Sequence, residues 1–301
     1  LFVSLVPAVS ASHITQYAVQ RDPSYISIGD LDCDGDNDIA SASTMGLFIT
    51  VLYNDGSGGF ADRQDVFISN NDSRRAGFVD TADGTRVEVA DIDGDGVNDL
   101  VYYQQNIRFV GESFVRPGNL TVLWGDCSER VNSWSDSEIT VSNPYLSDME
   151  VADIDGDGLK EAHCLAWNNA AYFNFEATGA DAYSIGDTNF VKLGESDDWT
   201  LGMAAADVDG DGKHEVYISG YYDSKVWVIT DADGDAGTLD TTGSSLKTFA
   251  GNTEIGIMAT NTVKNGVAAG SFGLAMGGAP GSDLHHWAYG TGSILDSASW
   301  T

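Results

Sequence analysis

A run of alternating carboxylates recurs four times along this chain and limits what the chain can fold into. The clearest copy, DIDGDGVND, spans Asp91–Asp99 and places Asp at positions 1, 3 and 5, Gly at position 6 and Asp at position 9. The copies begin at residues 30, 91, 153 and 207, so the steps between them are 61, 62 and 54 residues. A period of this size indicates a repeat architecture.

Short runs of β-forming residues flank each acidic copy, and no long segment has a 3.6-residue apolar period. Each repeat therefore reads as strand, acidic loop, strand, loop, strand, turn and strand, with the Asp-Gly turn NDGSGGF in the first repeat. The predicted strands are Ser24–Gly29, Asp38–Ser43, Leu47–Tyr53, Asp65–Ser69; Arg86–Ala90, Leu100–Gln104, Asn119–Trp124, Glu138–Ser142; Met149–Ala152, Ala162–Trp167, Ala170–Phe175, Asn189–Leu193; Gly202–Ala206, Val216–Ser219, Lys225–Thr230 and Ser245–Ala250.

Four antiparallel strands per repeat of about 60 residues are typical of a β-propeller blade. We therefore expect an all-β fold, a β-propeller of four-stranded antiparallel blades over residues 12–301, with repeats at about 24–84, 85–148, 149–199, 200–254 and a degenerate fifth at 255–301. In the fifth unit TVKNG replaces the acidic loop, so we expect no ion there. The five visible blades either close a ring, with His13–Gln20 as the outermost strand of the last blade, or belong to a fragment of a larger, seven-bladed ring.

The first residues, Leu1–Ala11, are apolar, and Val9 and Ala11 stand where small residues precede a signal-peptidase cut. This pattern predicts the remnant of a secretory signal peptide and an extracellular or cell-surface location. The alternative is a first buried strand. No other stretch approaches the length of about 18 apolar residues that a membrane span needs.

The acidic loops have the donor pattern of a site for a hard cation. Oxygens at positions 1, 3 and 5 point inward when the loop curls, Gly at position 6 permits the turn, and position 7 adds a carbonyl before the carboxylate at position 9. Oxygen ligation with several carboxylates favours Ca²⁺ over Mg²⁺, so we expect about four Ca²⁺ ions. The predicted ligands are Asp30, Asp32, Asp34, Asp36, Asp38; Asp91, Asp93, Asp95, Val97, Asp99; Asp153, Asp155, Asp157, Leu159, Glu161; Asp207, Asp209, Asp211, Lys213 and Glu215.

Two other patterns resemble these loops: the EF-hand and the stretch that contains Asp231, Asp233 and Asp235. An EF-hand requires Glu at position 12 and flanking helices; position 12 is Ser41, Tyr102, Cys164 and Ile218, and the flanks are β-like. The EF-hand is therefore excluded. The stretch with Asp231, Asp233 and Asp235 resembles a fifth site, but Leu239 occupies position 9, and we interpret it as a plain turn.

Asp-x-Asp-x-Asp-Gly-x-x-Asp/Glu between two strands resembles the FG-GAP/VCBS repeat, which forms the integrin-α-like β-propeller. All four copies, over about Ser24–Ala250, match at every pattern position, and Ser271–Pro280 is faintly similar to the family's Phe-Gly and Gly-Ala-Pro signature. The resemblance implies Ca²⁺ in the loops between the first and second strands of each blade, held by the carboxylates named above. It also implies partner binding on the opposite face, but it specifies no partner.

The net charge limits the classes of binding partner, and the cysteine count limits the possible disulfides. The chain carries 46 acidic and 14 basic residues, a net charge of −32, which argues against nucleic acid or an anionic membrane as partner. The three cysteines, Cys33, Cys127 and Cys164, form no disulfide framework; either one pair with a free thiol or three buried small residues fits.

No catalytic motif is present, so we predict a non-enzymatic module. The histidine pair His285–His286 beside Asp283 is the one cluster that suggests catalysis. We expect a secreted or cell-surface, calcium-braced propeller for adhesion, recognition or binding of a protein or glycan. The alternatives are a carbohydrate-active, lyase-like enzyme and a structural surface-layer component. Aromatic and amide residues that suit sugars lie in the connections between second and third strands, at Gln104–Asn106, Trp167–Asn169 and Tyr221–Asp223.

Overall fold

The computed structural model describes residues 15–20, 23–43, 48–68, 85–105, 108–110, 113–115, 117–142, 146–166, 171–185, 191–192, 200–207, 210–220, 225–230, 245–248, 271–275 and 284–288. In this part of the chain nearly all regular structure is β-strand, with one short 3₁₀ turn, η2 (Val131–Ser133). The all-β class is therefore confirmed. Leu1–Ala11 and Asp231–Asp235 lie outside the described residues. Among the described residues, no helix is both long and apolar enough to cross a membrane.

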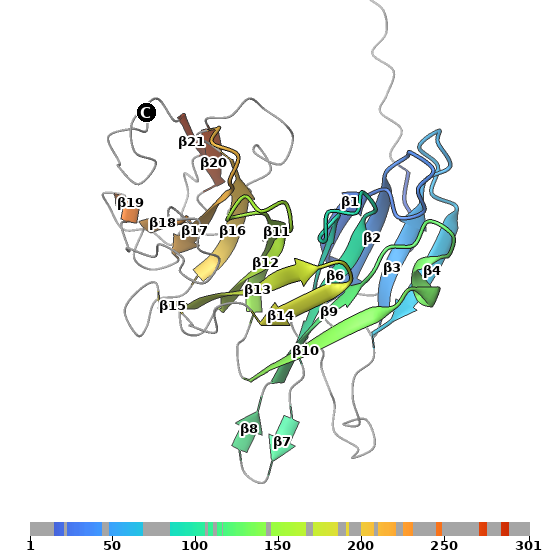
Figure 1. The fold of residues 1–301 in the computed structure, drawn as a ribbon, viewed down its shortest axis with the longest axis horizontal. Coiled ribbons are helices and arrows are strands. Elements are labelled where there is room, and N and C mark those ends of the chain that lie inside the picture. Colours follow the sequence, from blue (N-terminus) through green and yellow to red (C-terminus); the bar gives the residue numbers. More distant parts are fainter. Residues whose placement is uncertain are drawn as a thin grey trace, which may run out of the picture.

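Among the described residues, four antiparallel sheets of four main strands follow one another along the chain (Figure 1). Each is a meander of consecutive strands apart from the β7–β8 insertion. We number them sheets 1 to 4. Sheet 1 contains β1 (Pro23–Gly29), β2 (Asp38–Ser43), β3 (Phe48–Tyr53) and β4 (Asp62–Phe67). Sheet 2 contains β5 (Arg86–Ala90), β6 (Asp99–Gln105), β9 (Pro117–Leu123) and β10 (Asp136–Ser142). Sheet 3 contains β11 (Leu146–Ala152), β12 (Glu161–Ala166), β13 (Ala171–Gly179) and β14 (Ala182–Ile185), and sheet 4 contains β16 (Thr200–Ala206), β17 (Glu215–Gly220), β18 (Lys225–Ile229) and β19 (Ser245–Thr248).

Most of the predicted strands are confirmed, and the structure differs from the prediction in three places. In sheet 3 the predicted fourth strand, Asn189–Leu193, overlaps only the short β15 (Val191–Lys192); the main fourth strand is β14, because β13 continues to Gly179 and turns back at once. A hairpin of β7 (Arg108–Val110) and β8 (Ser113–Val115) extends from sheet 2, and the sequence pattern did not predict it. Residues 15–20 contain no strand, so the predicted strand His13–Gln20 is wrong over its described part.

In the fifth unit two strands are described, β20 (Ser271–Ala275) and β21 (Leu284–Ala288), and they pair antiparallel. They fall within the predicted fifth repeat, 255–301, whose other residues lie outside the described part of the chain. The described sheets follow an arc (Figure 1), and closure of that arc into a propeller ring remains a prediction.

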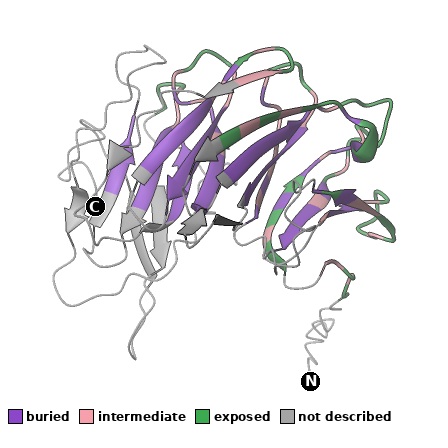
Figure 2. Ribbon diagram, turned by 90° about the horizontal axis from the view of Figure 1, so that it is seen from below, coloured by how far each residue is buried: buried purple, intermediate pink, exposed green. Residues whose placement is uncertain are grey.

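In the part of the chain that the structure describes, the hydrophobic core includes three layers, each between two consecutive sheets. Between sheets 1 and 2 the buried side chains include Val51 and Leu100; between sheets 2 and 3 they include Tyr103 and Phe175; between sheets 3 and 4 they include Ile218. Sheets 2 and 3 each pack between two neighbouring sheets, and every residue of β12 is buried. Buried residues, purple in Figure 2, lie mainly on the strands.

The first strands of the four sheets contact one another in order: β1 with β5, β5 with β11 and β11 with β16. A polar cluster joins them. The Tyr25 hydroxyl of β1 donates to Asp148 Oδ1 of β11 (2.9 Å), and the backbone N–H of Met203 in β16 donates to Asp148 Oδ2 (2.8 Å). The guanidinium of Arg86, on β5, lies 3.8 Å from the Tyr25 ring centroid. The sheets therefore converge on their first strands.

Candidate metal centres

Each acidic loop is folded by its own first carboxylate. Asp91 Oδ1 accepts a hydrogen bond from the N–H of Gly94 (2.9 Å), and Oδ2 accepts one from the N–H of Gly96 (3.1 Å). Asp153 and Asp207 repeat this pair of bonds, and Asp30 repeats the second of them. The predicted turn at position 6 is confirmed in all four loops, because the glycines there have φ of 94°, 91°, 92° and 98°. These glycines are Gly35, Gly96, Gly158 and Gly212.

The carboxylate at position 9 begins the second strand of each sheet and is buried. Asp99 is 3% exposed; its Oδ2 accepts the N–H of Ile92 (2.9 Å) and its Oδ1 accepts the N–H of Gly125 (2.7 Å), just after the third strand. Asp38 makes the same two contacts, with the N–H groups of Leu31 and Asn54, both at 2.8 Å. This residue therefore connects the acidic loop to the end of the third strand.

Burial raises the pKa of three of these carboxyl groups, those of Asp38, Asp99 and Glu161. The pKa of Asp99 rises to about 7, because burial disfavours the charged form and the two backbone N–H donors compensate only in part. The pKa of Glu161 rises to about 9 through burial, with added repulsion from Glu176, Asp155 and Asp153. A cation beside these groups would oppose the shift by favouring their ionised forms.

The structure brings the carboxylates of positions 1, 3 and 9 together in the first three loops, with ligand oxygens within 4.8 Å of one another. These groups are Asp30, Asp32 and Asp38; Asp91, Asp93 and Asp99; and Asp153, Asp155 and Glu161. In the fourth loop Asp209 lies outside the described residues. The fourth site therefore stays a prediction.

The predicted ligands at positions 5 and 7 are not among the carboxylates that the structure brings together. Position 5 is not part of the three groups in the described residues, and its side chain instead accepts the N–H of position 7, at 2.9, 2.7, 2.7 and 2.9 Å in the four loops. The acceptors are Asp34, Asp95, Asp157 and Asp211, and the donors are Asp36, Val97, Leu159 and Lys213. Ligation by the position 7 carbonyls stays a prediction.

Several carboxylate oxygens in these groups are buried without a hydrogen-bond partner in the described structure. They are Oδ1 of Asp30, Oδ1 of Asp32 and Oε1 of Glu161. A buried charged oxygen without a partner is costly, and a cation is the partner that suits it. The atoms available as metal ligands are all oxygens, so the groups fit a hard ion such as Ca²⁺.

Successive acidic loops lie side by side and are linked through position 8. Asn98 Nδ2 donates to the Asp30 carbonyl (3.0 Å), and the Lys160 N–H donates to the Ile92 carbonyl (2.8 Å). The N–H of His214 donates in the same way to the Asp153 carbonyl (2.9 Å). The four loops therefore form one continuous row along a single edge of the sheets.

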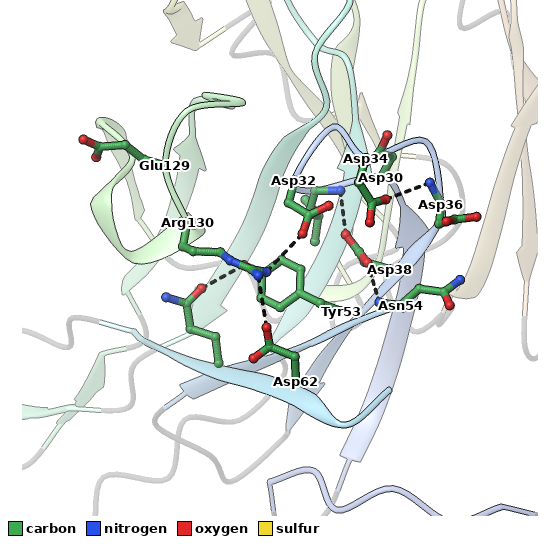
Figure 3. Close-up of polar contacts among 12 residues, drawn as sticks. Asp30, Asp32, Asp34, Asp36, Asp38, Tyr53, Asn54, Asp62, Glu129 and Arg130 are labelled. Carbon is green, nitrogen blue, oxygen red and sulfur yellow. Dashed lines mark hydrogen bonds and ion pairs between the residues drawn. The ribbon is translucent and has the colours of Figure 1, made fainter. Parts of the chain in front are cut away.

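The first loop is also held by the turn between β9 and β10 of sheet 2 (Figure 3). Cys33, at position 4 of this loop, forms a disulfide with Cys127, which settles the cysteine alternatives in favour of one pair with a buried free thiol at Cys164. Arg130, from the same turn, lies 3.1 Å from Asp32 and 3.0 Å from Asp62 and stacks over the Tyr53 ring. Sequence reasoning missed Arg130, because nothing local marks it.

The residues predicted to suit a sugar are mostly untested. Gln104 is 1% exposed and therefore cannot contact an external sugar in this structure. Trp167–Asn169 and Tyr221–Asp223 lie outside the described residues. His285 and His286 lie on β21, where the structure describes the backbone alone.

No family model and no curated protein matches this sequence. Among solved structures, the chain is similar to a lectin from Agrocybe aegerita described as recognising non-reducing terminal N-acetylglucosamine, with 18% identity and a TM-score of 0.43. The match covers 91% of this chain and 64% of the lectin chain, so the chain spans less than two thirds of that protein.

Proposed function

We propose that this chain is a calcium-braced β-propeller of the FG-GAP/VCBS type that acts outside the cell or at its surface as a non-enzymatic recognition or adhesion module for a protein or glycan ligand. The arrangement of sheets supports the propeller: consecutive four-stranded meanders pack face to face, and their first strands contact one another in order. The disulfide between Cys33 and Cys127 is compatible with an oxidising compartment.

One observation carries the calcium assignment. Three loops of the same pattern each gather three carboxylates within 4.8 Å, and oxygens of Asp30, Asp32 and Glu161 in these groups are buried without a hydrogen-bond partner. Like charges held this close repel one another, so the ionised carboxylates of these loops are stabilised by a positive charge among them. A bound Ca²⁺ supplies that charge, and the carboxylates at positions 1, 3 and 9 would hold it.

The position of the loops supports the proposal of a bracing role. Each loop joins the first and second strands of a sheet and is hydrogen bonded to the next loop, as Asn98 is to Asp30. Four equivalent loops in a row suit a scaffold better than a single centre of action. We therefore place ligand recognition elsewhere on the protein.

Thermal unfolding with and without calcium tests this proposal. An ion that binds only the native state stabilises it by about 2.7 kcal/mol per site at a free concentration 100 times its Kd. We expect Ca²⁺ to raise the Tm of chelator-treated protein by several degrees per occupied site, and equimolar Mg²⁺ to raise it less. A melting curve that is unchanged by excess chelator or by added Ca²⁺ would overturn the calcium assignment.

Matched variants localise the effect. Asp93→Asn and Asp155→Asn each remove one charge from a predicted site and should each lower the number of ions bound, measured by calorimetric titration. Asp136→Asn removes one charge from an exposed position on β10 and should leave the stoichiometry unchanged. Equal stoichiometry in all three variants would contradict the assigned ligands.

A further inference from the structure

The residue at position 8 of each acidic loop stands between two predicted ligands of its own loop. In the second loop this residue is Asn98. It follows Val97, whose carbonyl is the predicted ligand at position 7, and precedes Asp99, the carboxylate at position 9. A cation in the second loop would bind on both sides of Asn98. It would therefore fix the backbone from which this side chain extends.

Asn98 in turn holds the first ligand of the preceding loop. Its Nδ2 donates to the carbonyl of Asp30 (3.0 Å), and Asp30 is position 1 of the first loop. The Asp30 carboxylate also closes that loop, because its Oδ2 accepts the N–H of Gly35 (2.9 Å). Its Oδ1 is one of the buried oxygens without a hydrogen-bond partner in the described structure. One side chain thus joins the ligand sets of two loops.

The same link recurs between the other successive loops. In the third loop position 8 is Lys160, whose N–H donates to the carbonyl of Ile92 (2.8 Å), between positions 1 and 3 of the second loop. In the fourth loop it is His214, whose N–H donates to the carbonyl of Asp153 (2.9 Å), position 1 of the third loop. His214 Nδ1 lies 3.0 Å from the same carbonyl oxygen. Every pair of successive loops is therefore joined from position 8 to the start of the preceding ligand set.

Position 4 shows how closely successive loops approach each other. A Cβ built on Gly94 of the second loop would lie 3.1 Å from the carbonyl oxygen of Gly158 in the third loop. A Cβ built on Gly156 of the third loop would lie 3.1 Å from Cγ of Lys213 in the fourth. With so little space between them, a change in the shape of one loop displaces atoms of the next.

Charge repulsion between bound ions does not prevent adjacent loops from filling together. Each loop has carboxylates at positions 1, 3, 5 and 9, which together carry more negative charge than one Ca²⁺ neutralises when they are ionised. A filled loop therefore still attracts a cation to its neighbour, although less strongly than an empty loop does. The short-range links then decide whether one ion helps the next to bind.

We propose that position 8 is a positioning residue through which each acidic loop organises the loop before it, so that the row of loops binds Ca²⁺ cooperatively. This inference rests on the calcium assignment and adds a coupling between the sites. An ion in one loop fixes position 8 and, through it, part of the neighbouring ligand set, so the next ion has fewer residues to order. Such coupling is reciprocal: filling either loop raises the affinity of the other by the same factor.

An NMR titration of the full-length protein with Ca²⁺ tests the coupling, because the amide resonances of the position 6 glycines distinguish the loops. Gly35 reports on the first loop and Gly96 on the second, since each N–H donates to the position 1 carboxylate of its own loop. Asp93→Asn alters no ligand of the first loop. We nevertheless expect it to raise the Ca²⁺ concentration that half-saturates Gly35 about tenfold. Asp32→Asn should raise that of Gly96 by a similar factor.

Asn98→Ala tests the link itself, because it leaves every predicted ligand side chain in place. It should weaken the first loop about as much as Asp93→Asn does, and the double variant should be no weaker than either single variant. This non-additivity distinguishes coupling through Asn98 from a general loss of structure. Asn37→Ala is the matched control. Asn37 is exposed at position 8 of the first loop, which no acidic loop of the described structure precedes, so both half-saturation concentrations should stay unchanged.

The possible outcomes separate this proposal from the calcium assignment. If Asp93→Asn leaves Gly35 unaffected, or if the losses in the double variant are additive, the loops fill independently and the coupling is overturned while the calcium assignment holds. A tighter first loop in Asp93→Asn would show that repulsion between neighbouring ions dominates, and it too would overturn the coupling. Ca²⁺ that shifts neither glycine in the wild-type protein would overturn the calcium assignment at these loops together with the coupling.

Discussion

Cys33 in the first acidic loop is bonded to Cys127 in the turn of the neighbouring sheet, with their Cα atoms 5.4 Å apart and a separation of 94 in sequence. The bond ties a candidate metal loop directly to the next sheet. Breaking it should therefore affect both the stability of the fold and cation binding at the first loop.

We expect the double substitution Cys33→Ala with Cys127→Ala to lower the free energy of unfolding by about 4 kcal/mol, because a loop of this length loses much entropy when it is closed. Denaturant unfolding measures the change. Reductant should destabilise the wild-type protein by a similar amount and leave the double variant unchanged. Equal sensitivity of both proteins to reductant would show that the bond does not form in solution.

Arg130 places a positive charge 3.1 Å from Asp32, a predicted ligand of the first loop. We expect Arg130→Gln to raise the calcium affinity of that loop about fivefold, because it removes a competing cation at a partly exposed site. Calorimetric titration measures the affinity. Arg63→Gln is the matched control, since Arg63 pairs with Asp65 on the same sheet and, among the described residues, its polar contacts are with Asp65 and Ala18 and not with an acidic loop. If both substitutions change the affinity equally, the effect comes from net charge alone.

Asp148 accepts three hydrogen bonds at the point where the first strands meet, from Tyr25, Met149 and Met203. Asp148→Asn would set an amide N–H₂ against a donor in this buried cluster. We expect a loss of about 1–3 kcal/mol in the free energy of unfolding, measured by urea denaturation. Asp136→Asn, on the exposed side of β10, should stay within about 0.5 kcal/mol of the wild type. An equally small effect at Asp148 would show that this cluster does not help to hold the sheets together.

His163 is fully buried, with Nδ1 2.6 Å from the Tyr172 hydroxyl and Nε2 3.1 Å from the Ala152 carbonyl. Burial lowers the pKa of His163 to about 4, because the imidazolium would lose its hydration. The unfolded chain therefore takes up this proton first, and stability is lost as the pH falls below about 6.5.

The expected loss from this histidine between pH 7 and pH 5 is about 2 kcal/mol. Burial raises the pKa of Asp99 and Glu161, and these groups act in the opposite direction in the metal-free protein. The measurement is therefore the difference in unfolding free energy between wild type and His163→Gln, which should shrink by about 2 kcal/mol over this range. His214→Gln is the control. A difference that does not change with pH would falsify the assignment of a buried neutral imidazole.

The sequence by itself determined the parts of this protein that depend on neighbouring residues. A nine-residue pattern is enough to predict the acidic loops, since each loop is closed by hydrogen bonds within itself. It predicts the flanking strands, the positive φ of Gly96 and the gathering of Asp91, Asp93 and Asp99. Alternation of side chains along short strands likewise predicted most of the four sheets. The pattern failed where a strand end has no local signal, as at β14.

Only the tertiary structure decided how these pieces meet. Three features depend on the packing of one sheet against the next. They are the bond between Cys33 and Cys127, the approach of Arg130 to Asp32, and the exposure of Ile26 at the register where Val87 is buried. Their partners are tens of residues apart in the chain, so no short-range propensity encodes them. Free energy gained by burying apolar faces brings these sheets together, and the side chains that happen to face each other there then pair.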